Sequence, residues 1–341
     1  MIVETPSEAP EFTTTPVEIC VGESVTLEVL NPTELGTGAE WVWYTTSCGG
    51  TEVHRGATYP VSPTATTTYY VRAESNGPCA NSVCASITVT VYEAPSPAVA
   101  GDDQEHCDNA TFTLNATAPA VGTGQWSGTL PAGASIADPT LPNTTVTLPA
   151  GQTVTLTWTV TNGVCDPSTD QVTLTNLEAI ANNTITADQT ICDNTAPAAL
   201  SGSTPTGGNG TYQYQWQHST TNTPASFTDI AGATAAGYTP GALTATTYYR
   251  RVVTSGSCAN TSNVITITVN PLPVFTVTNV AAICNTVTTF DVNYTNTIGA
   301  PDRYDLVTAS GQTPMPGFTA ITNGTLPAVA NGTQGLSLIH I

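Results

Sequence analysis

Apolar and polar residues alternate in short runs along most of the chain. The alternation is clear at 25–29, 154–160 and 265–269, where every second residue is apolar. This period of two places the apolar side chains on one face of an extended strand. No stretch carries apolar residues at helical spacing over three turns. The pattern predicts short β-strands with one buried face, and therefore an all-β chain.

Cysteines and aromatic residues repeat together with the strands. A first cysteine recurs at Cys20, Cys107, Cys192 and Cys284, which stand 87, 85 and 92 residues apart in similar contexts. A second cysteine follows 58–66 residues later in three units, just before a final alternating strand. In each of these three units a tryptophan-bearing strand follows 19–24 residues after the first cysteine. Many short strands separated by Gly, Pro and Asn turns are typical of antiparallel sandwiches.

The repeats and the proline-containing junctions divide the chain into tandem antiparallel β-sandwiches. We expect the end of a preceding repeat with its linker, three complete domains and a truncated fourth domain, at 1–10, 11–93, 94–177, 178–270 and 271–335. The fourth unit is short and lacks a second cysteine. Residues 336–341, Leu-Ser-Leu-Ile-His-Ile, match nothing in the repeats and correspond to one reading frame of a transposon-end sequencing adapter. We interpret them as a processing scar.

The nine cysteines predict disulfides. No Cys-x-x-Cys occurs and no Cys/His group has zinc spacing, whereas disulfides in small domains are typical of an oxidising exterior. We predict one bridge inside each complete unit and a second in the first unit: Cys20–Cys79, Cys107–Cys165, Cys192–Cys258 and Cys48–Cys84. Four cysteines in one unit allow three connectivities, and aligning Cys79-Ala-Asn with Cys258-Ala-Asn favours this one. Cys284 is left unpaired.

The charge balance excludes several classes of partner. The chain has 25 Asp and Glu against 5 Arg, no Lys, and a formal net charge of -20. Nucleic acids and anionic membrane surfaces need basic patches, so neither is an expected partner. No run of 18 apolar residues occurs, and Met1 to Pro10 lacks the basic and apolar regions of a signal peptide. We therefore predict no membrane insertion in this stretch, and no signal peptide is visible in it.

Motifs in the units resemble known repeat families. In the first unit they are the Trp strand, Cys-Gly-Gly and the last strands, at 41–43, 48–50, 62–73 and 79–91. In the third unit they are YQYQWQ, FTDIAGAT, YTPGALTATTYYRRVV and SNVITITVNP, at 212–217, 227–234, 238–253 and 262–271. In the fourth they are RYDLV, GF and NGTLPA, at 303–307, 317–318 and 323–328.

These motifs resemble immunoglobulin-like repeats, and the second unit more loosely resembles a PKD-like repeat, of large surface proteins in Bacteroidetes. The resemblance covers about 11–335. It implies tandem immunoglobulin-like antiparallel β-sandwiches, the last one truncated, in a secreted or cell-surface protein of gliding or adhesin type. Such proteins are often exported by the type IX route through a C-terminal sorting domain, and no such domain is recognised in this stretch.

Two groups of side chains are candidates for ligand binding. Asp102, Asp103 and Glu105 stand at the junction of units one and two and offer the oxygen ligands that Ca²⁺ prefers. In the alternative, Asp103, like Asp188 in unit three, hydrogen-bonds a turn before the first strand.

Aromatic residues of unit one are the second group. Trp41, Tyr44 and Tyr59 have rings that can stack on sugars, although the alternation favours a sandwich core for such rings. Arg250 and Arg251 in unit three are expected on a solvated face.

No catalytic motif is found. His54, His106, His218 and His340 are isolated, and neither H-E-x-x-H nor G-x-S-x-G occurs. We therefore predict that this stretch is not an enzyme, with no cofactor apart from the calcium considered above.

The expected function is a non-catalytic stalk or adhesive repeat segment of an extracellular or cell-surface bacterial protein. Its expected partners are surface glycans or proteins of host or neighbouring cells. One alternative is a carbohydrate-binding accessory segment of a secreted glycoside hydrolase, which an exposed aromatic platform would favour. The other is a structural fibre subunit in which chains exchange strands.

Overall fold

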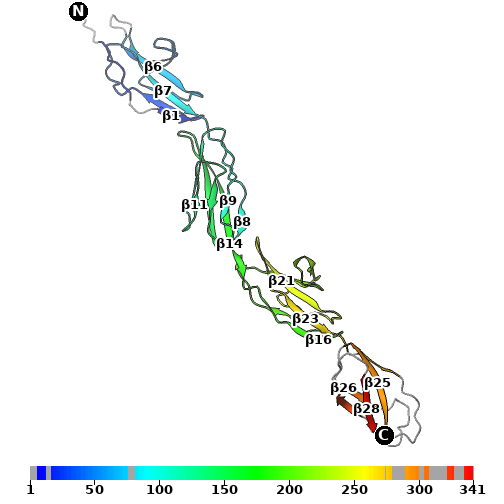
Figure 1. The fold of residues 1–341 in the computed structure, drawn as a ribbon. Helices are drawn as coiled ribbons and strands as arrows, with labels where there is room; N and C mark the ends of the chain where they lie inside the picture. Colours follow the sequence, from blue (N-terminus) through cyan, green and yellow to red (C-terminus); the bar gives the residue numbers. More distant parts are fainter. Residues whose placement is uncertain are drawn as a thin grey trace, which may run out of the picture. The chain divides into compact units, whose positions relative to one another are not determined.

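The computed structural model describes most of the first 272 residues and five later strands (Figure 1). The described residues are 6–12, 17–75, 81–272, 274–278, 289–298, 303–306, 321–325 and 334–340. They form strands, turns and a short 3-10 turn, η1 (Pro224–Ser226), and within them no helix is long and apolar enough to cross a membrane. The chain divides into two compact units, Met1–Glu178 and Ala179–Ile341. The predicted all-β fold is confirmed.

The first sandwich packs a five-stranded sheet against a two-stranded one. The strand order is β1 (Val17–Cys20), β7 (Ala85–Tyr92), β6 (Thr67–Glu74), β3 (Glu40–Thr45) and β4 (Thr51–Arg55), with β2 (Val25–Glu28) and β5 (Thr58–Val61) in the second sheet. Alternation sets the inward face, because Tyr69, Val71 and Ala73 of β6 are buried and the residues between them are half-buried. Trp41 and Trp43 fill the core between the sheets.

The second sandwich repeats this plan with a different second sheet. Its main sheet contains β10 (Thr123–Ser127), β13 (Gln152–Thr161), β14 (Ser168–Ala181) and β8 (Gln104–Cys107), and the second contains β11 (Ser135–Ile136), β12 (Thr145–Thr147) and β9 (Thr111–Thr113). Trp126 and Trp158 face each other across β10 and β13 with ring centroids 5.0 Å apart. Both rings are buried with Phe112 in one apolar cluster.

The third sandwich has a more polar interior. Its main sheet contains β16 (Gln189–Cys192), β23 (Ile265–Asn270), β21 (Thr247–Ser255), β19 (Gln213–Ser219), β20 (Thr228–Asp229) and β22 (Cys258–Thr261), and the opposite side contains β15 (Ile185–Thr186) and β17 (Ser201–Gly202). A short strand, β18 (Thr206–Gly208), follows β17. Trp216, Tyr249 and Ile267 are buried in its core.

Five further strands follow the third sandwich. They form two small sheets, β24 (Val274–Thr278), β25 (Thr289–Ile298) and β28 (Gln334–His340) in one, and β26 (Arg303–Leu306) and β27 (Ile321–Thr325) in the other. β28 covers most of the segment 336–341. The interpretation of this segment as a processing scar stays a prediction.

Each of the three sandwiches is closed by a parallel pair, which is an exception to the expected antiparallel pairing. The first strand lies parallel to the last one in β1–β7, β8–β14 and β16–β23. The first cysteine ends the first strand in each case, where Cys20, Cys107 and Cys192 pair with Tyr92, Leu177 and Asn270. The backbone N–H that follows each cysteine donates to the carbonyl of the paired residue, at 2.8, 2.9 and 2.8 Å. The three cysteines are therefore structurally equivalent.

Candidate functional site

The most distinctive site is a covalent junction between the first two sandwiches. Cys20 of the first sandwich is disulfide-bonded to Cys165 of the second, with a Cα–Cα distance of 4.9 Å and a sequence separation of 145. The predicted pairings Cys20–Cys79 and Cys107–Cys165 are therefore wrong. Instead of closing a single domain, this bridge connects neighbours.

The parallel closure explains why the predicted pairing fails. In the second sandwich Cys107 pairs with Leu177 near the far end of β14, whereas Cys165 lies in the turn just before β14 begins at Ser168. Nine residues of extended strand separate these two ends, which is about 30 Å. The first and second cysteines of one sandwich therefore lie at opposite ends of it, far beyond the reach of a disulfide.

At the junction itself, the exit end of the first sandwich meets the entry end of the second. β7 ends at Tyr92, and Tyr92 O accepts the hydrogen bond from Val21 N, next to Cys20. Asn162 Nδ2 donates to Glu93 O at 2.8 Å. Gly163 has φ +55°, and a Cβ added there would lie 2.4 Å from the ring of Tyr92. The turn that presents Cys165 can therefore approach the first sandwich only because this residue is glycine.

The linker after Glu93 is held along the second sandwich by its own backbone. Ala98 N donates to Ser168 Oγ at 2.9 Å, and Ala100 N donates to Asp170 Oδ2 at 2.8 Å. The hydrogen bond from Ala100 N, followed by that from Gln171 N, lowers the pKa of the Asp170 carboxyl. The linker is thus an ordered part of the second sandwich.

The acidic residues beside the linker hold strands together. Asp103 Oδ1 accepts a hydrogen bond from Thr173 N on β14, and Asp188 Oδ1 accepts one from Thr266 N on β23, both at 2.7 Å. Each carboxylate therefore accepts a backbone hydrogen bond, as the alternative to calcium binding predicted. The donor lies in the last strand of the same sandwich and not in a turn before the first strand. Within the described residues no group of three or more His, Cys, Asp or Glu could hold a metal ion. Asp102, Asp103 and Glu105 are thus not gathered into a ligand set, and calcium binding stays a prediction.

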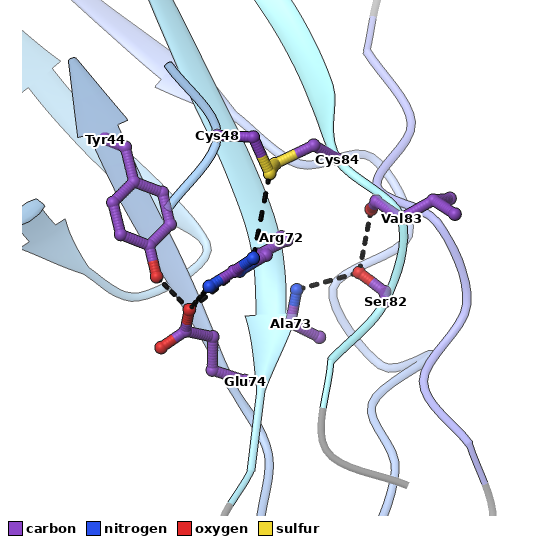
Figure 2. The surroundings of a disulfide bond; sticks show 8 residues. All are labelled: Tyr44, Cys48, Arg72, Ala73, Glu74, Ser82, Val83 and Cys84. Atoms are coloured by element: carbon purple, nitrogen blue, oxygen red, sulfur yellow. Dashed lines mark hydrogen bonds and ion pairs between the residues drawn. A yellow bond between two sulfur atoms is a disulfide. The ribbon is translucent and has the colours of Figure 1, made fainter. Parts of the chain in front are cut away.

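A second disulfide lies inside the first sandwich. Cys48 and Cys84 are bonded as predicted, with a Cα–Cα distance of 6.1 Å. Figure 2 shows Arg72 between this bond and Glu74. Arg72 Nη1 lies 3.9 Å from Cys48 Sγ, while Arg72 Nε and Nη2 donate to Glu74 Oε1.

Tyr44 completes this polar group. Its hydroxyl donates to the same Glu74 oxygen (Figure 2). Burial, followed by the hydrogen bond to Glu74, raises the pKa of Tyr44 to about 12. The phenol therefore stays protonated at neutral pH and acts as a structural donor.

The candidate glycan-binding aromatics do not form an exposed platform. Trp41 is 1% exposed and Tyr44 is 4% exposed, so neither ring offers a surface to a sugar. Tyr59 is half-buried and stacks on His54 with ring centroids 4.7 Å apart. The candidate stacking on sugars is contradicted by burial for Trp41 and Tyr44. The alternation of β3 turns Trp41 into the core, whereas Tyr44 lies on the opposite face of β3, where the Arg72 guanidinium covers its ring at 5.3 Å from the centroid.

The third sandwich buries a guanidinium that we expected on a solvated face. Arg251 is 0% exposed. Its Nε and Nη2 donate to Asn183 Oδ1 at 3.1 and 2.9 Å, Nη2 also donates to Ser203 O at 2.9 Å, and Nη1 donates to Ala236 O at 2.8 Å. Desolvation lowers the pKa of Arg251. The alternation with Tyr249 and Val253 was the signal that could have placed it inside.

The remaining cysteines differ in state. Cys107 and Cys258 are disulfide-bonded, whereas Cys192 is free and exposed. The predicted Cys192–Cys258 bond is therefore wrong. Cys79 and the predicted unpaired Cys284 lie outside the described residues.

The described histidines pack as aromatic rings. His106 stacks on Phe112 at 4.1 Å, and His218 stacks on Tyr249 at 6.4 Å, as His54 stacks on Tyr59. His340 lies in β28, and its side chain is outside the described residues.

Two family models match parts of the chain. Residues 7–92 match the model described as Ig-like domain, CHU_C associated, and residues 181–271 match a domain of unknown function, DUF8696. No curated protein sequence matches the chain.

Several solved structures are similar to the chain at low sequence identity. The I-band fragment I67-I69 from titin is 12% identical, with 76% of this chain and 98% of that chain covered and a TM-score of 0.46. The N-terminal eight Ig domains of Down Syndrome Cell Adhesion Molecule are 14% identical, with coverage of 78% and 36% and a TM-score of 0.48. The three N-terminal domains of the outer capsid protein Hoc of bacteriophage RB49 are 14% identical, with coverage of 73% and 95% and a TM-score of 0.38.

The sheets described above and the Ig-like match over 7–92 establish the fold as tandem immunoglobulin-like β-sandwiches. The disulfides and the Ig-like repeat agree with a non-enzymatic structural or adhesion module.

Proposed function

We propose that the chain is a non-catalytic stalk or adhesive segment of a secreted or cell-surface bacterial multidomain protein. The observation that supports this function is the Cys20–Cys165 bond between consecutive sandwiches. A covalent bond at this place keeps two neighbouring domains together when the chain is pulled. Disulfides also persist in an extracellular environment.

The bond changes the path that tension takes through the chain. A force applied to the two ends passes from Cys20 to Cys165 through the sulfur atoms. The segment between them, with a sequence separation of 145, includes most of both sandwiches and is bypassed by this bond. The two domains therefore keep their folds, and any surface they present, under load.

Single-molecule pulling of the full chain by its ends tests this proposal. Both proteins compared carry Cys107→Ser, because Cys107 lies in this segment and forms a disulfide of its own. In that background Cys20→Ser should lengthen further than the protein with Cys20, because unfolding then releases the segment between Cys20 and Cys165. The 36-residue separation closed by Cys48–Cys84 stays closed in both proteins. The expected gain is about 370 Å at full extension. Equal extension of the two proteins would contradict the mechanical role.

No observation favours the two alternatives. The glycan-binding segment depended on an exposed aromatic platform, and Trp41 and Tyr44 are buried. A glycan array probed with the full chain checks this point, since specific binding to one sugar class would restore that function. For the strand-exchanged fibre, the described strands offer no specific support.

A further inference from the structure

We propose that Cys192 is the open half of a second inter-repeat disulfide, and that its partner is the turn cysteine of a following immunoglobulin-like repeat. The proposal goes beyond the stalk function, since it assigns a covalent attachment site and the chemistry of its partner. The partner is a cysteine placed like Cys165, in the turn before the last strand of its own sandwich.

The equivalence of Cys192 and Cys20 carries the argument. Both end a first strand that lies parallel to the last strand, and they pair with Asn270 and Tyr92, the final residues of β23 and β7. The following N–H donates to the paired carbonyl at 2.8 Å in both sandwiches. Cys192 therefore lies at the end from which the chain leaves the third sandwich, as Cys20 does in the first.

The bonding states of the equivalent cysteines point to a missing ligand. Cys20 is bonded to the next sandwich, and Cys107 is also disulfide-bonded. Cys192 is the described member of this set that is free, and its side chain is exposed. A cysteine within its own sandwich is not the partner, because Cys258 is already bonded.

The spacing identifies which residue type should arrive at this position. In the first three units the second cysteine follows the first by 58–66 residues, and Cys165, the second cysteine that bonds Cys20, comes just before the last strand of its sandwich. The partner is thus the second cysteine of a repeat that follows the third sandwich. Formation of the bond converts two thiols to a disulfide, and two electrons and two protons pass to a disulfide oxidant such as oxidised glutathione, which becomes two thiols.

A hybrid chain tests the proposal directly. Residues 1–270 are followed by a copy of 93–177, so that the copied Cys165 stands to Cys192 as the original Cys165 stands to Cys20; the copied Cys107 is changed to Ser. The copied segment includes a sandwich with an apolar core of its own. After oxidation with glutathione, peptide mapping should find Cys192 bonded to the copied Cys165 and protected from alkylation.

The matched control changes the copied Cys165 to Ser, which should leave Cys192 fully alkylated. The original Cys20–Cys165 bond reports within each molecule that folding and oxidation succeeded. The proposal is overturned if that bond forms while Cys192 remains alkylated in the hybrid chain. Pulling of Cys20→Ser is a separate measurement, so failure here would leave the stalk function standing.

A second measurement uses the full 341-residue chain in case the copied sandwich does not fold. The variant Cys20→Ser frees Cys165, and concentrated samples are oxidised with glutathione. Cross-links between Cys165 of one molecule and Cys192 of another should exceed Cys165–Cys165 cross-links, and they should vanish in Cys20→Ser/Cys192→Ser. An excess of Cys165–Cys165 cross-links would contradict the proposal that Cys192 preferentially pairs with the turn cysteine of another repeat.

Discussion

The first and third sandwiches place very different side chains at the same position of the core. Val71 of β6 lies opposite Trp43 of β3, and Arg251 of β21 lies opposite Trp216 of β19. All four side chains are fully buried. The same fold therefore accepts either an aliphatic side chain or a guanidinium at one inward position.

The difference lies in what the surrounding loops offer. Val71 packs in an apolar cluster of the first sandwich. Around Arg251, carbonyl oxygens of Asn183, Ser203 and Ala236 converge from three separate segments, and none of its described partners is a carboxylate. A buried cation costs free energy unless its donors are satisfied, so the arginine is tolerated because it fastens these segments to the sheet.

The second sandwich offers a third solution at this position. Trp158 of β13 lies opposite Trp126 of β10. Its ring takes the space in which a Cβ of Gly124 would lie, 2.0 Å from the ring carbon Cζ2. Its indole N–H has no hydrogen-bond partner among the described residues. All three sandwiches keep the same strand pairing at this position. The side chain that can be buried there, apolar or charged, depends on the groups that the surrounding loops place around it.

The largest loss of stability is expected when a guanidinium is placed in the core of the first sandwich, where it has no hydrogen-bond acceptors. Val71→Arg should unfold the first sandwich, with a loss of more than about 5 kcal/mol, because the guanidinium would be buried without partners. Denaturant unfolding followed by tryptophan fluorescence measures the loss. Val71→Ile serves as the matched apolar control. A stable, folded Val71→Arg protein would show that the first sandwich can also recruit acceptors.

Removing the guanidinium of Arg251 from the third sandwich should lower its stability by less than Val71→Arg lowers that of the first, but still by several kcal/mol. Arg251→Ala leaves three acceptor groups without a donor and a cavity beside Trp216, and we expect a loss of about 3–5 kcal/mol. Arg250→Ala is the matched control, because Arg250 is half-buried, donates to Gln217 Oε1 at 2.6 Å and lies over the Phe227 ring. Thermal melts of both variants test the ranking. If Arg250→Ala were the more damaging, the proposed fastening role of Arg251 would be wrong.

Much of the fold was predictable from the alternation of apolar and polar residues. The strands carrying Trp158 and Ile267 follow directly from it, since their buried side chains stand at every second position. The same alternation would have placed Arg251 inside, but its charge argued for the surface. Only the structure shows the acceptors that reverse this preference.

The site was less predictable than the fold. The spacing of cysteines revealed the repeat, and Cys48–Cys84 was predicted correctly. The Cys20–Cys165 bond was missed because sequence distance does not show at which end of a sandwich a cysteine lies. That end is set by the parallel pairing of first and last strands, which the alternation pattern leaves undetermined.

Alkaline pH should have a smaller effect, and on both the first and the third sandwich, because each contains a tyrosine whose pKa is raised to about 12, Tyr44 and Tyr249. Tyr249, at the position equivalent to Tyr69, has its pKa raised to about 12 by burial and then by Tyr238. Burial also raises the pKa of Tyr69. Because the neutral phenol is favoured in the fold, its contribution is complete below pH ~10, the ordinary pKa of tyrosine, and is lost as pH rises toward about 12.

Stability measured between these pH values should therefore fall in the wild type. Tyr249→Phe should flatten the fall for the third sandwich and leave the first unchanged. Tyrosinate absorbance recorded during the titration identifies the group that ionises. A fall of the same steepness in Tyr249→Phe would assign the effect to other groups.

The smallest effect is expected at the carboxylates that bond the last strand in the second and third sandwiches. Asp103→Ala and Asp188→Ala each remove one acceptor for a backbone N–H, from Thr173 and Thr266. Because both residues are exposed, water replaces the lost acceptor, and we expect a loss of about 1 kcal/mol or less at each. Thermal melts with and without millimolar calcium measure it. A strand-bonding role predicts an equal loss of melting temperature in both variants, with and without calcium. The contrary outcome is a rise of the wild-type melting temperature with calcium that Asp103→Ala abolishes and Asp188→Ala does not. That result would make Asp103 a calcium ligand.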